Sequence, residues 1–238
     1  MNKLQKKYSP KINLEKLGEY LAASPRGRRR VIKSLKRKRK FVSTSYKQAE
    51  KIISKYIAYG EGHDELVLNE IKRLEKKIPV SDLDEQKDLL CIEAMELFLD
   101  IADEISINEF DSMKEDPTTP TSIMIAGVTI DINPEIILRN LNLETGSKVG
   151  AIKIYFSKNY PLSRNAGYYM STILYQYLEE HLGDVGEPDH SHCYVIDVFN
   201  QKVYETPRAH KRYRADVQAA CEEIARAWAF LKKLTDKF

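Results

Sequence analysis

Two residues that could take part in metal-assisted chemistry lie in successive strand-like segments. Asp131 closes the segment GVTID, and Lys153 lies in the middle of VGAIKIYF. A carboxylate can hold Mg²⁺ through oxygen, and a nearby lysine can orient water or offset charge on a phosphate. Lys153 alternates with Ala151 and Tyr155, so the three should share one face of their strand. A lysine on such an apolar face needs an ion-pair partner or a cleft.

A second carboxylate would be needed for catalysis, because Asp131 alone would hold Mg²⁺ weakly. Glu135 is nearest in the sequence, and a turn at Pro134 could bring it back beside Asp131 and Lys153. The expected catalytic set is Asp131, Glu135 and Lys153, with Asp131 and Glu135 binding Mg²⁺ if the protein is active and no cofactor otherwise. Asp131 could instead simply end its strand or cap the turn. Other candidate acids are Glu96, Asp103 and Asp197.

Charge is unevenly distributed along the chain. Residues 1–60 contain 18 Lys and Arg against 3 Asp and Glu, residues 81–118 contain 2 against 13, and the whole chain carries +3. Many cations in one segment concentrate phosphate and release counterions on contact, which indicates a polyanionic partner. The alternative is that the basic and acidic segments pair with each other.

Two basic clusters are candidate nucleic-acid contacts. The segment PRGRRRVIKSLKRKRKF has few apolar residues and is either a helix with a thin apolar stripe or an arm that orders on binding. The segment RAHKRYR opens the last helical stretch and places Tyr213 among cations, which suits phosphate contacts and base stacking, although a solvated helix start would look the same. The expected contacts are Arg26, Arg28, Arg29, Arg30, Lys33, Lys36, Arg37, Lys38, Arg39, Lys40, Arg208, Lys211, Arg212 and Arg214.

Size and composition indicate one good-sized core with an extension, since the chain has 238 residues and is 42% hydrophobic. No apolar run reaches the roughly 18 residues of a spanning helix, and no signal peptide is apparent. We therefore expect a soluble, cytoplasmic protein without a membrane partner. The cysteines Cys91, Cys193 and Cys221 are scattered and odd in number, so they should be reduced and buried.

Hydrophobic periodicity divides the chain into a helical first part and a mixed body. A period near 3.6 predicts helices at 12–23, 44–58, 64–77, 82–106, 161–183 and 208–236. A period of 2 predicts strands at 122–132 and 148–157, joined by a partly helical or looped link at 134–148, and a hairpin around Asn200-Gln201. The segment EPDHSHCY is expected to be a loop leading into a strand, with solvent-facing histidines rather than a zinc site.

The order of these elements resembles the core of the PD-(D/E)XK nuclease superfamily, and its RecB-type branch in particular. Residues 127–131 are similar to a family strand of form G-x-(I/V)-D with one extra residue. Residues 149–153 are similar to the next strand, apolar-apolar-(D/E)-x-K, except that Ala151 replaces the acid. The helix ending in YQY is similar to the family's Q-x-x-x-Y helix, out of register. The likeness covers roughly residues 85–205.

The order of the expected elements predicts an α+β fold. A basic helical region, residues 1–80, should precede a domain at residues 81–238 that the resemblance implies is nuclease-like. That domain would have a restriction-endonuclease-like core, a small mixed sheet flanked by helices. The implied function is nucleic-acid binding, DNA more than RNA, with Mg²⁺-dependent cleavage in genome defence or DNA processing if the site is intact. The alternative class is a non-catalytic subunit or interaction protein whose basic arm docks on an acidic partner, or a head-to-tail homo-oligomer.

Overall fold

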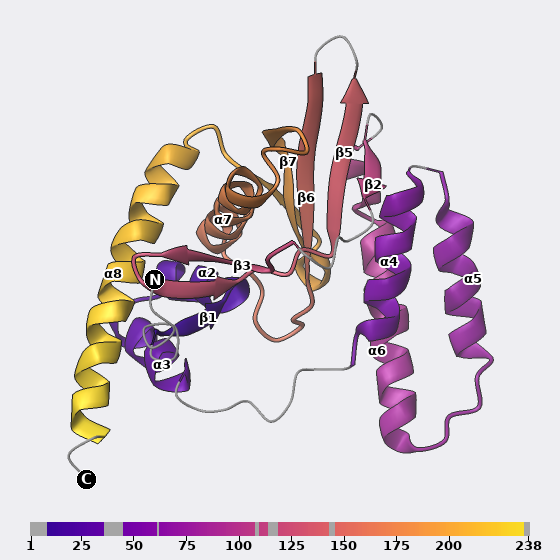
Figure 1. Ribbon diagram of the computed structural model, residues 1–238. Coiled ribbons are helices and arrows are strands. Elements are labelled where there is room, and N and C mark those ends of the chain that lie inside the picture. The colour runs from indigo at the N-terminus through magenta and orange to yellow at the C-terminus, as the bar shows by residue number, and fades with distance from the viewer. Residues whose placement is uncertain are drawn as a thin grey trace.

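The computed structural model describes residues 9–35, 45–60, 62–107, 110–113, 119–142 and 146–235, which form a mixed α/β fold (Figure 1). Its α-helices within these residues are α2 (Leu14–Ala22), α3 (Pro25–Leu35), α4 (Lys47–Tyr59), α5 (Asp64–Glu75), α6 (Asp82–Leu99), α7 (Arg164–His181) and α8 (His210–Thr235). Its strands are β1 (Lys11–Asn13), β2 (Asp111–Met113), β3 (Ser122–Ile125), β4 (Val128–Asp131), β5 (Ile136–Asn142), β6 (Gly146–Tyr155), β7 (Glu187–Asp197) and β8 (Lys202–Glu205).

The larger sheet has five strands in the order β2-β5-β6-β7-β8. Strands β5 and β6 form an antiparallel hairpin, and β7 then pairs parallel to β6 after the chain has crossed over through α7. Strand β8 returns antiparallel to β7, so the predicted hairpin around Asn200-Gln201 is confirmed. The second sheet has three strands in the order β1-β4-β3 and is also mixed.

Helices cover both faces of the larger sheet (Figure 1). On one face, Ile152 and Ile154 of β6 join a buried cluster with residues of α4, α5 and α6. On the other, Ala151 joins a second cluster with α2, α7 and α8. Both clusters contain residues from before and after position 80. In the first cluster, α4 and α5 pack with α6. On the side of the second cluster, β1 pairs with β4.

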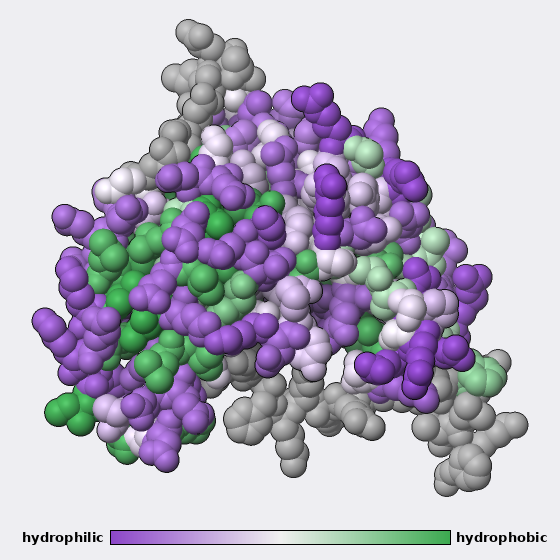
Figure 2. All heavy atoms as spheres, turned by 180° about the vertical axis from the view of Figure 1, so that it is seen from behind, coloured by the Kyte–Doolittle hydropathy of each residue, from purple (hydrophilic) through white to green (hydrophobic). Residues whose placement is uncertain are grey.

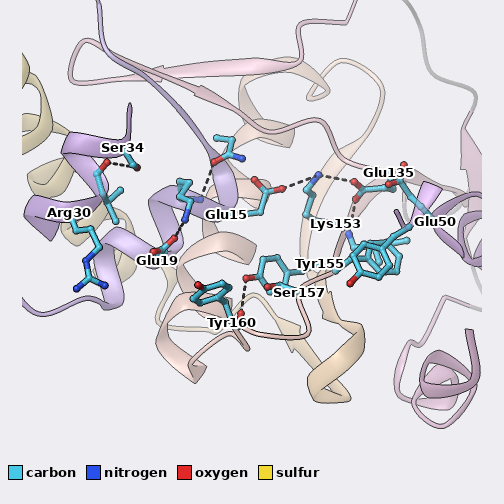
Figure 3. Close-up of a pocket in the computed structure, with 16 residues that line it drawn as sticks. Glu15, Glu19, Arg30, Ser34, Glu50, Glu135, Lys153, Tyr155, Ser157 and Tyr160 are labelled. Atoms are coloured by element: carbon cyan, nitrogen blue, oxygen red, sulfur yellow. Dashed lines mark hydrogen bonds and ion pairs between the residues drawn. The ribbon is translucent and has the colours of Figure 1, made fainter. Parts of the chain in front are cut away.

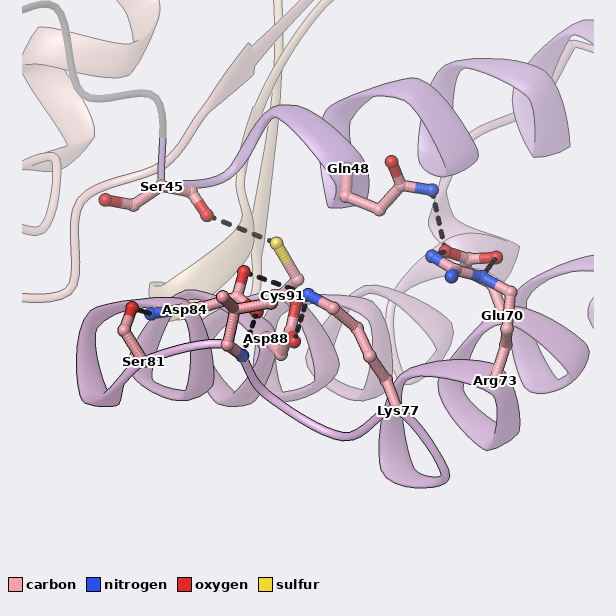
Figure 4. A network of polar contacts seen from close by, with 10 residues as sticks. Ser45, Gln48, Glu70, Arg73, Lys77, Ser81, Asp84, Asp88 and Cys91 are labelled. Carbon is pink, nitrogen blue, oxygen red and sulfur yellow. Dashed lines mark hydrogen bonds and ion pairs between the residues drawn. The ribbon is translucent and has the colours of Figure 1, made fainter.

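Polar contacts tie the three helices α4, α5 and α6 to one another (Figure 4). Gln48 of α4 donates to Glu70 of α5 at 2.6 Å, and Arg73 donates to the same carboxylate through two nitrogens at 2.6 and 2.8 Å. Lys77, just after α5, pairs with Asp84 at 2.9 Å and Asp88 at 2.6 Å on α6. These contacts fix the helical layer that carries one wall of the candidate site.

The segment 122–132, expected to be one strand, is instead the hairpin of β3 and β4. Ala126 and Gly127 form its two-residue turn with φ of +46° and +78°. Positive φ at both central residues gives a turn whose twist matches the strands that it joins, and glycine adopts such a φ without strain. The alternation of apolar residues continues unbroken through this turn, so the pattern alone did not reveal it.

The link expected at 134–148 is also different, because most of it is strand β5. Ile136 and Leu138 are buried and alternate with half-buried residues, and β5 pairs with β6 from Ile136↔Ile152 to Asn142↔Gly146. The helix expected at 82–106 is shorter than predicted, because α6 ends at Leu99 and has 18 residues. The segment expected as a loop at 187–194 belongs to β7.

Helix α7 begins at a Ser163 N-cap, whose side chain accepts from the backbone N–H of Ala166, and packs closely on β8. A Cβ on Gly167 would lie 2.3 to 2.6 Å from ring atoms of the buried Tyr204. The Tyr204 hydroxyl also donates to the Leu162 carbonyl at 3.0 Å, which holds the ring in place. Glycine is therefore required at position 167 by the close approach of the ring.

Gly167→Ala is expected to destabilise the fold by about 1–3 kcal/mol, the usual cost of overpacking a core. The measurement is urea unfolding followed by circular dichroism. Gly183→Ala is the matched control, because its added Cβ would meet the nearest atom, the Glu179 carbonyl oxygen, at an ordinary 3.5 Å. Equal stability of the two variants would contradict this assignment.

The three cysteines are free and buried, as expected. Among the described residues, no helix combines the length and apolarity needed to cross a membrane.

Candidate functional site

A cavity of about 630 Å³ opens where α2, α3 and the start of α4 meet the end of β6 (Figure 3). Helix α2 contributes acidic and basic side chains, α3 contributes Arg30 and Ser34, and β6 contributes Lys153 and Tyr155. Helix α2 begins at an Asn13 N-cap, whose side chain accepts from the Lys16 N–H at 3.1 Å. This cap places Glu15 in the first turn, where a carboxylate is favoured by the helix dipole.

Lys153 lies at the centre of the cavity wall and is only 6% exposed. Its ammonium group pairs with Glu135 at 2.7 Å and with Glu15 at 3.4 Å, and it donates to the Asn133 carbonyl at 2.9 Å. The expected ion-pair partner of Lys153 is therefore present as two carboxylates. Figure 3 shows Glu15 and Glu135 on opposite sides of the lysine.

Glu135 lies just before β5, and both oxygens of its carboxylate accept hydrogen bonds from residues of β6. Its second oxygen accepts from the Ile154 N–H at 2.6 Å, so the side chain bridges β6 to the chain before β5. Burial raises the pKa of Glu135 to about 7, against the opposing effect of Lys153 and the Ile154 N–H. Burial alone would lower the pKa of Lys153, but Glu135 and Glu15 outweigh burial and raise it. Lys153 is therefore protonated at neutral pH.

Asp131 lies apart from this pair. It ends β4 in the smaller sheet, and its carboxylate pairs with Lys11 of the parallel strand β1 at 3.0 Å. Asp131 is not among the residues that line the cavity, whereas Glu135 and Lys153 both are. The strand that precedes and pairs with β6 is β5, not β4. Of the two acids expected beside Lys153, Glu135 therefore lies there and Asp131 does not.

The residues present do not fit the Mg²⁺ site that the resemblance implies. One oxygen of Glu135 is engaged by Lys153 and the other by the Ile154 N–H, and the Asp131 carboxylate pairs with Lys11. In the part of the chain that the structure describes, no three His, Cys, Asp or Glu side chains are grouped to hold a metal ion. The ammonium of Lys153 lies between the carboxylates of Glu135 and Glu15.

The other acids considered as ligands lie elsewhere. Glu96 is exposed on α6, and Asp103 lies in a short 3₁₀ turn after that helix. Asp197 is fully buried at the end of β7 and accepts from the Leu162 N–H at 2.7 Å. Its role is structural, since it fixes the loop that leads into α7.

Asp197→Asn is expected to flatten the dependence of stability on pH. Burial raises the pKa of Asp197 to about 6, so the folded state retains this proton more tightly than the unfolded state does. Its contribution to stability is complete below the ordinary carboxyl pKa and is lost as the pH rises through about 6. The loss is about 3 kcal/mol.

Asparagine imitates the protonated acid and does not titrate, so the variant should show a smaller fall in stability between pH 4 and 7 than the unmutated protein. Urea unfolding at several pH values measures the difference. Glu135 titrates over an overlapping range in both proteins, and the comparison cancels its contribution. An identical pH slope in the two proteins would show that folding does not raise the pKa of Asp197.

The first basic cluster forms helix α3 as far as the structure describes it. Four of its cations, Arg26, Arg29, Arg30 and Lys33, are exposed. Arg28 instead lies over the Tyr20 ring and pairs with Glu223 of α8 at 3.3 Å. Residues Lys36, Arg37, Lys38, Arg39 and Lys40 lie outside the described residues.

The second basic cluster, at the start of α8, also contains both exposed cations and a cation that pairs within the protein. Arg208, Lys211 and Arg212 are exposed. Arg214 pairs with Glu179 of α7 at 2.6 Å and lies over the Tyr175 ring, 4.8 Å from its centroid. Arg214 therefore holds α8 against α7, and three cations of the cluster face outward.

The histidines of the segment at 187–194 are half-buried in β7 rather than solvent-facing. His192 lies 3.2 Å from Asp189, which also accepts from Lys148 at 3.0 Å and from the Ser191 hydroxyl at 2.6 Å. Although burial opposes it, hydrogen bonds from Ser191 and Lys148 hold the pKa of Asp189 well below its usual range. This network fastens the first half of β7 to β6.

Sequence reasoning missed the residues that α2 and α3 bring to the cavity, chiefly Glu15 and Ser34. The N-cap pattern at Asn13 could have placed Glu15 in a first helical turn, but nothing local relates that turn to β6.

The chain matches no protein-family model and no curated protein.

Proposed function

We propose that the protein binds nucleic acid and that α3 is its main contact surface. The observation that carries the proposal is the spacing of Arg26, Arg29, Arg30 and Lys33, which follows the i, i+3, i+4, i+7 pattern of one helix face. All four side chains are exposed, while Val31 and Ile32 on the opposite face are buried. A rigid row of cations anchored in this way suits the regularly spaced phosphates of a nucleic-acid strand.

Electrostatics of the isolated helix support an external partner. The first turn of α3 contains no acid, and cations there oppose the helix dipole. Like charges three and four residues apart also repel one another. Within the described residues, no carboxylate pairs with any of the four exposed cations. A polyanion on this face would relieve both penalties.

A restriction-endonuclease-like core is the finer description of the fold that we propose for the body. Its support is that β5, β6, α7 and β7 follow α6 in this order, after the intervening strands β2, β3 and β4. Lys153 lies in β6, and Glu135 lies directly before β5. Because both candidate ligands are engaged by lysines, we infer a binding role and no hydrolytic step. DNA is the expected polymer, and the buried free thiols fit a cytoplasmic location.

Fluorescence anisotropy with labelled single- and double-stranded DNA and RNA tests the proposal. Four phosphate contacts should give a slope of log affinity against log salt of roughly −3 to −4 on duplex DNA. Affinity that hardly changes between about 50 and 200 mM salt would overturn the electrostatic surface. Cleavage by the unmutated protein with Mg²⁺ or Mn²⁺, lost in Asp131→Ala or Lys153→Ala, would overturn the non-hydrolytic role.

The second candidate function is self-association, which the outer face of α6 favours. Asp82, Glu85 and Glu96 are exposed on this helix together with Leu89, which is 58% exposed. Exposed apolar residues continue nearby at Ile78 and Val80, and Figure 2 shows apolar side chains among hydrophilic ones on the α4–α6 side of the molecule.

An acidic and apolar helix face of this kind complements α3 of a second copy, which would give a head-to-tail assembly. Size-exclusion chromatography on protein freed of nucleic acid separates the two functions. An electrostatic oligomer should dissociate at high salt, whereas a monomeric nucleic-acid binder should elute at the same volume at low and high salt.

A further inference from the structure

The cavity beside α3 has the size and lining of a small-molecule site. Its volume of about 630 Å³ falls within the roughly 300–1,000 Å³ typical of ligand pockets. One end is formed by Arg30, which also belongs to the exposed row of cations on α3, and the middle is formed by Lys153 with its two carboxylates (Figure 3). A strand lying along α3 would therefore pass the mouth of the cavity.

Aromatic rings supply the apolar part of the lining. Tyr46 and Phe156 stack on each other with centroids 5.4 Å apart, so their faces are partly used. Tyr160 is 76% exposed at the rim, and its carbonyl accepts from the Tyr155 hydroxyl at 2.7 Å, which fixes the backbone beneath it. An exposed ring on a fixed backbone is a platform on which a nucleobase can stack.

The acidic groups of the cavity differ in what they can offer a ligand, and one of them, Glu50 on α4, is exposed to solvent. Both oxygens of Glu135 are engaged, by Lys153 and by the Ile154 N–H. Glu19 is paired with Lys16. Among the described residues, the ion pair of Glu15 is the longer 3.4 Å contact with Lys153, and 27% of its side chain is exposed, so its carboxylate can accept further hydrogen bonds. The interior thus presents an acceptor, and the mouth presents a cation.

We propose that this cavity takes in one nucleotide of a strand bound on α3 and that it prefers guanine. Guanine carries two adjacent donors, N1–H and the N2 amino group, which match the two oxygens of the Glu15 carboxylate. The base stacks on Tyr160 and the phosphate stays outside on Arg30. Uracil and thymine would instead turn carbonyl oxygens toward the carboxylate. The inference rests on the proposed nucleic-acid function.

Isothermal titration with guanosine and inosine monophosphates tests the preference, because the two nucleotides differ only in the N2 amino group. Guanosine monophosphate should bind about tenfold more tightly, the effect of one hydrogen bond to a charged group. Glu15→Gln should remove most of this difference, and Tyr160→Ala should weaken both nucleotides. Glu96→Gln, which alters an exposed acid on α6, is the matched control and should change neither.

Equal binding of the two nucleotides, or no binding of either at millimolar concentration, would overturn the guanine pocket. Anisotropy with oligonucleotides separates this failure from failure of the proposed function. Salt-dependent oligonucleotide binding without a guanine preference would support α3 as the contact surface and overturn the proposed guanine pocket. Guanine-selective binding of mononucleotides without oligonucleotide binding would support the guanine pocket and overturn α3 as a nucleic-acid contact surface.

Discussion

Replacing Arg26, Arg29, Arg30 and Lys33 with glutamate is expected to weaken nucleic-acid binding by more than about 100-fold at moderate salt. Each cation that contacts a phosphate releases about one counterion, and four reversed charges would both lose these contacts and repel the strand. The fold should persist, since all four side chains are exposed and the buried face of α3 is unchanged. Anisotropy measures the affinity, and circular dichroism checks the helix content.

A control of equal charge distinguishes a local surface from a general effect of net charge. Lys51 and Lys55 on α4 and Lys72 and Lys76 at α5 are exposed, and their reversal changes the net charge by the same amount. The control should lose much less affinity than the α3 variant, because long-range attraction between exposed charges is screened within about 10 Å. If both variants lose affinity equally, α3 is not the contact surface.

Lys153→Met is expected to destabilise the protein by about 3–5 kcal/mol, the range found when one partner of a buried ion pair is removed. Methionine fills a similar volume but leaves Glu135 buried without its cation and Glu15 without its contact. The loss should be smaller at pH 5 than at pH 8, because an unpaired, buried Glu135 becomes protonated at low pH. Urea unfolding at the two pH values provides the measurement.

A second substitution separates the ion pair from simple packing. Lys153→Met combined with Glu135→Gln removes the uncompensated charge and should recover a substantial part of the stability, with little remaining pH dependence. Lys158→Met is the control, because its pair with Glu93 at 2.6 Å is largely exposed and such pairs contribute little. A Lys153→Met variant as stable as the unmutated protein would refute the buried pair as a structural element.

The sequence predicts the elements whose periodicity is local. Helices α2, α4, α5, α7 and α8 and the strand through Lys153 all lie close to their expected ranges. The hairpin at Ala126-Gly127 and strand β5 were not predicted, because their identity depends on which strand pairs with which. The pattern IILRNLN reads as a strand only once β6 supplies a partner for it.

In the candidate site, too, the sequence predicts local relationships but not contacts that depend on how strands pair. Period-two alternation places Lys153 on one face, and proximity in sequence selects Glu135, so these two residues could be brought together in advance. Asp131 could not be excluded, because its separation from them follows from the parallel pairing of β4 with β1. Glu15 was missed because its contact with Lys153 joins residues far apart in the sequence.

The pairing of β1 with β4 also constrains when the binding surface can form during synthesis. Lys11–Asn13 pair with Thr129–Asp131, so a growing chain cannot complete this sheet until residue 131 has been made. Contacts between such distant residues are slow to form because a long loop must be closed first. The basic helix leaves the ribosome early, yet the core that anchors Val31 and Ile32 includes residues of β4, α7 and α8. A nascent chain therefore displays its cations before they have a rigid arrangement, and ordered spacing is a property of the finished protein alone.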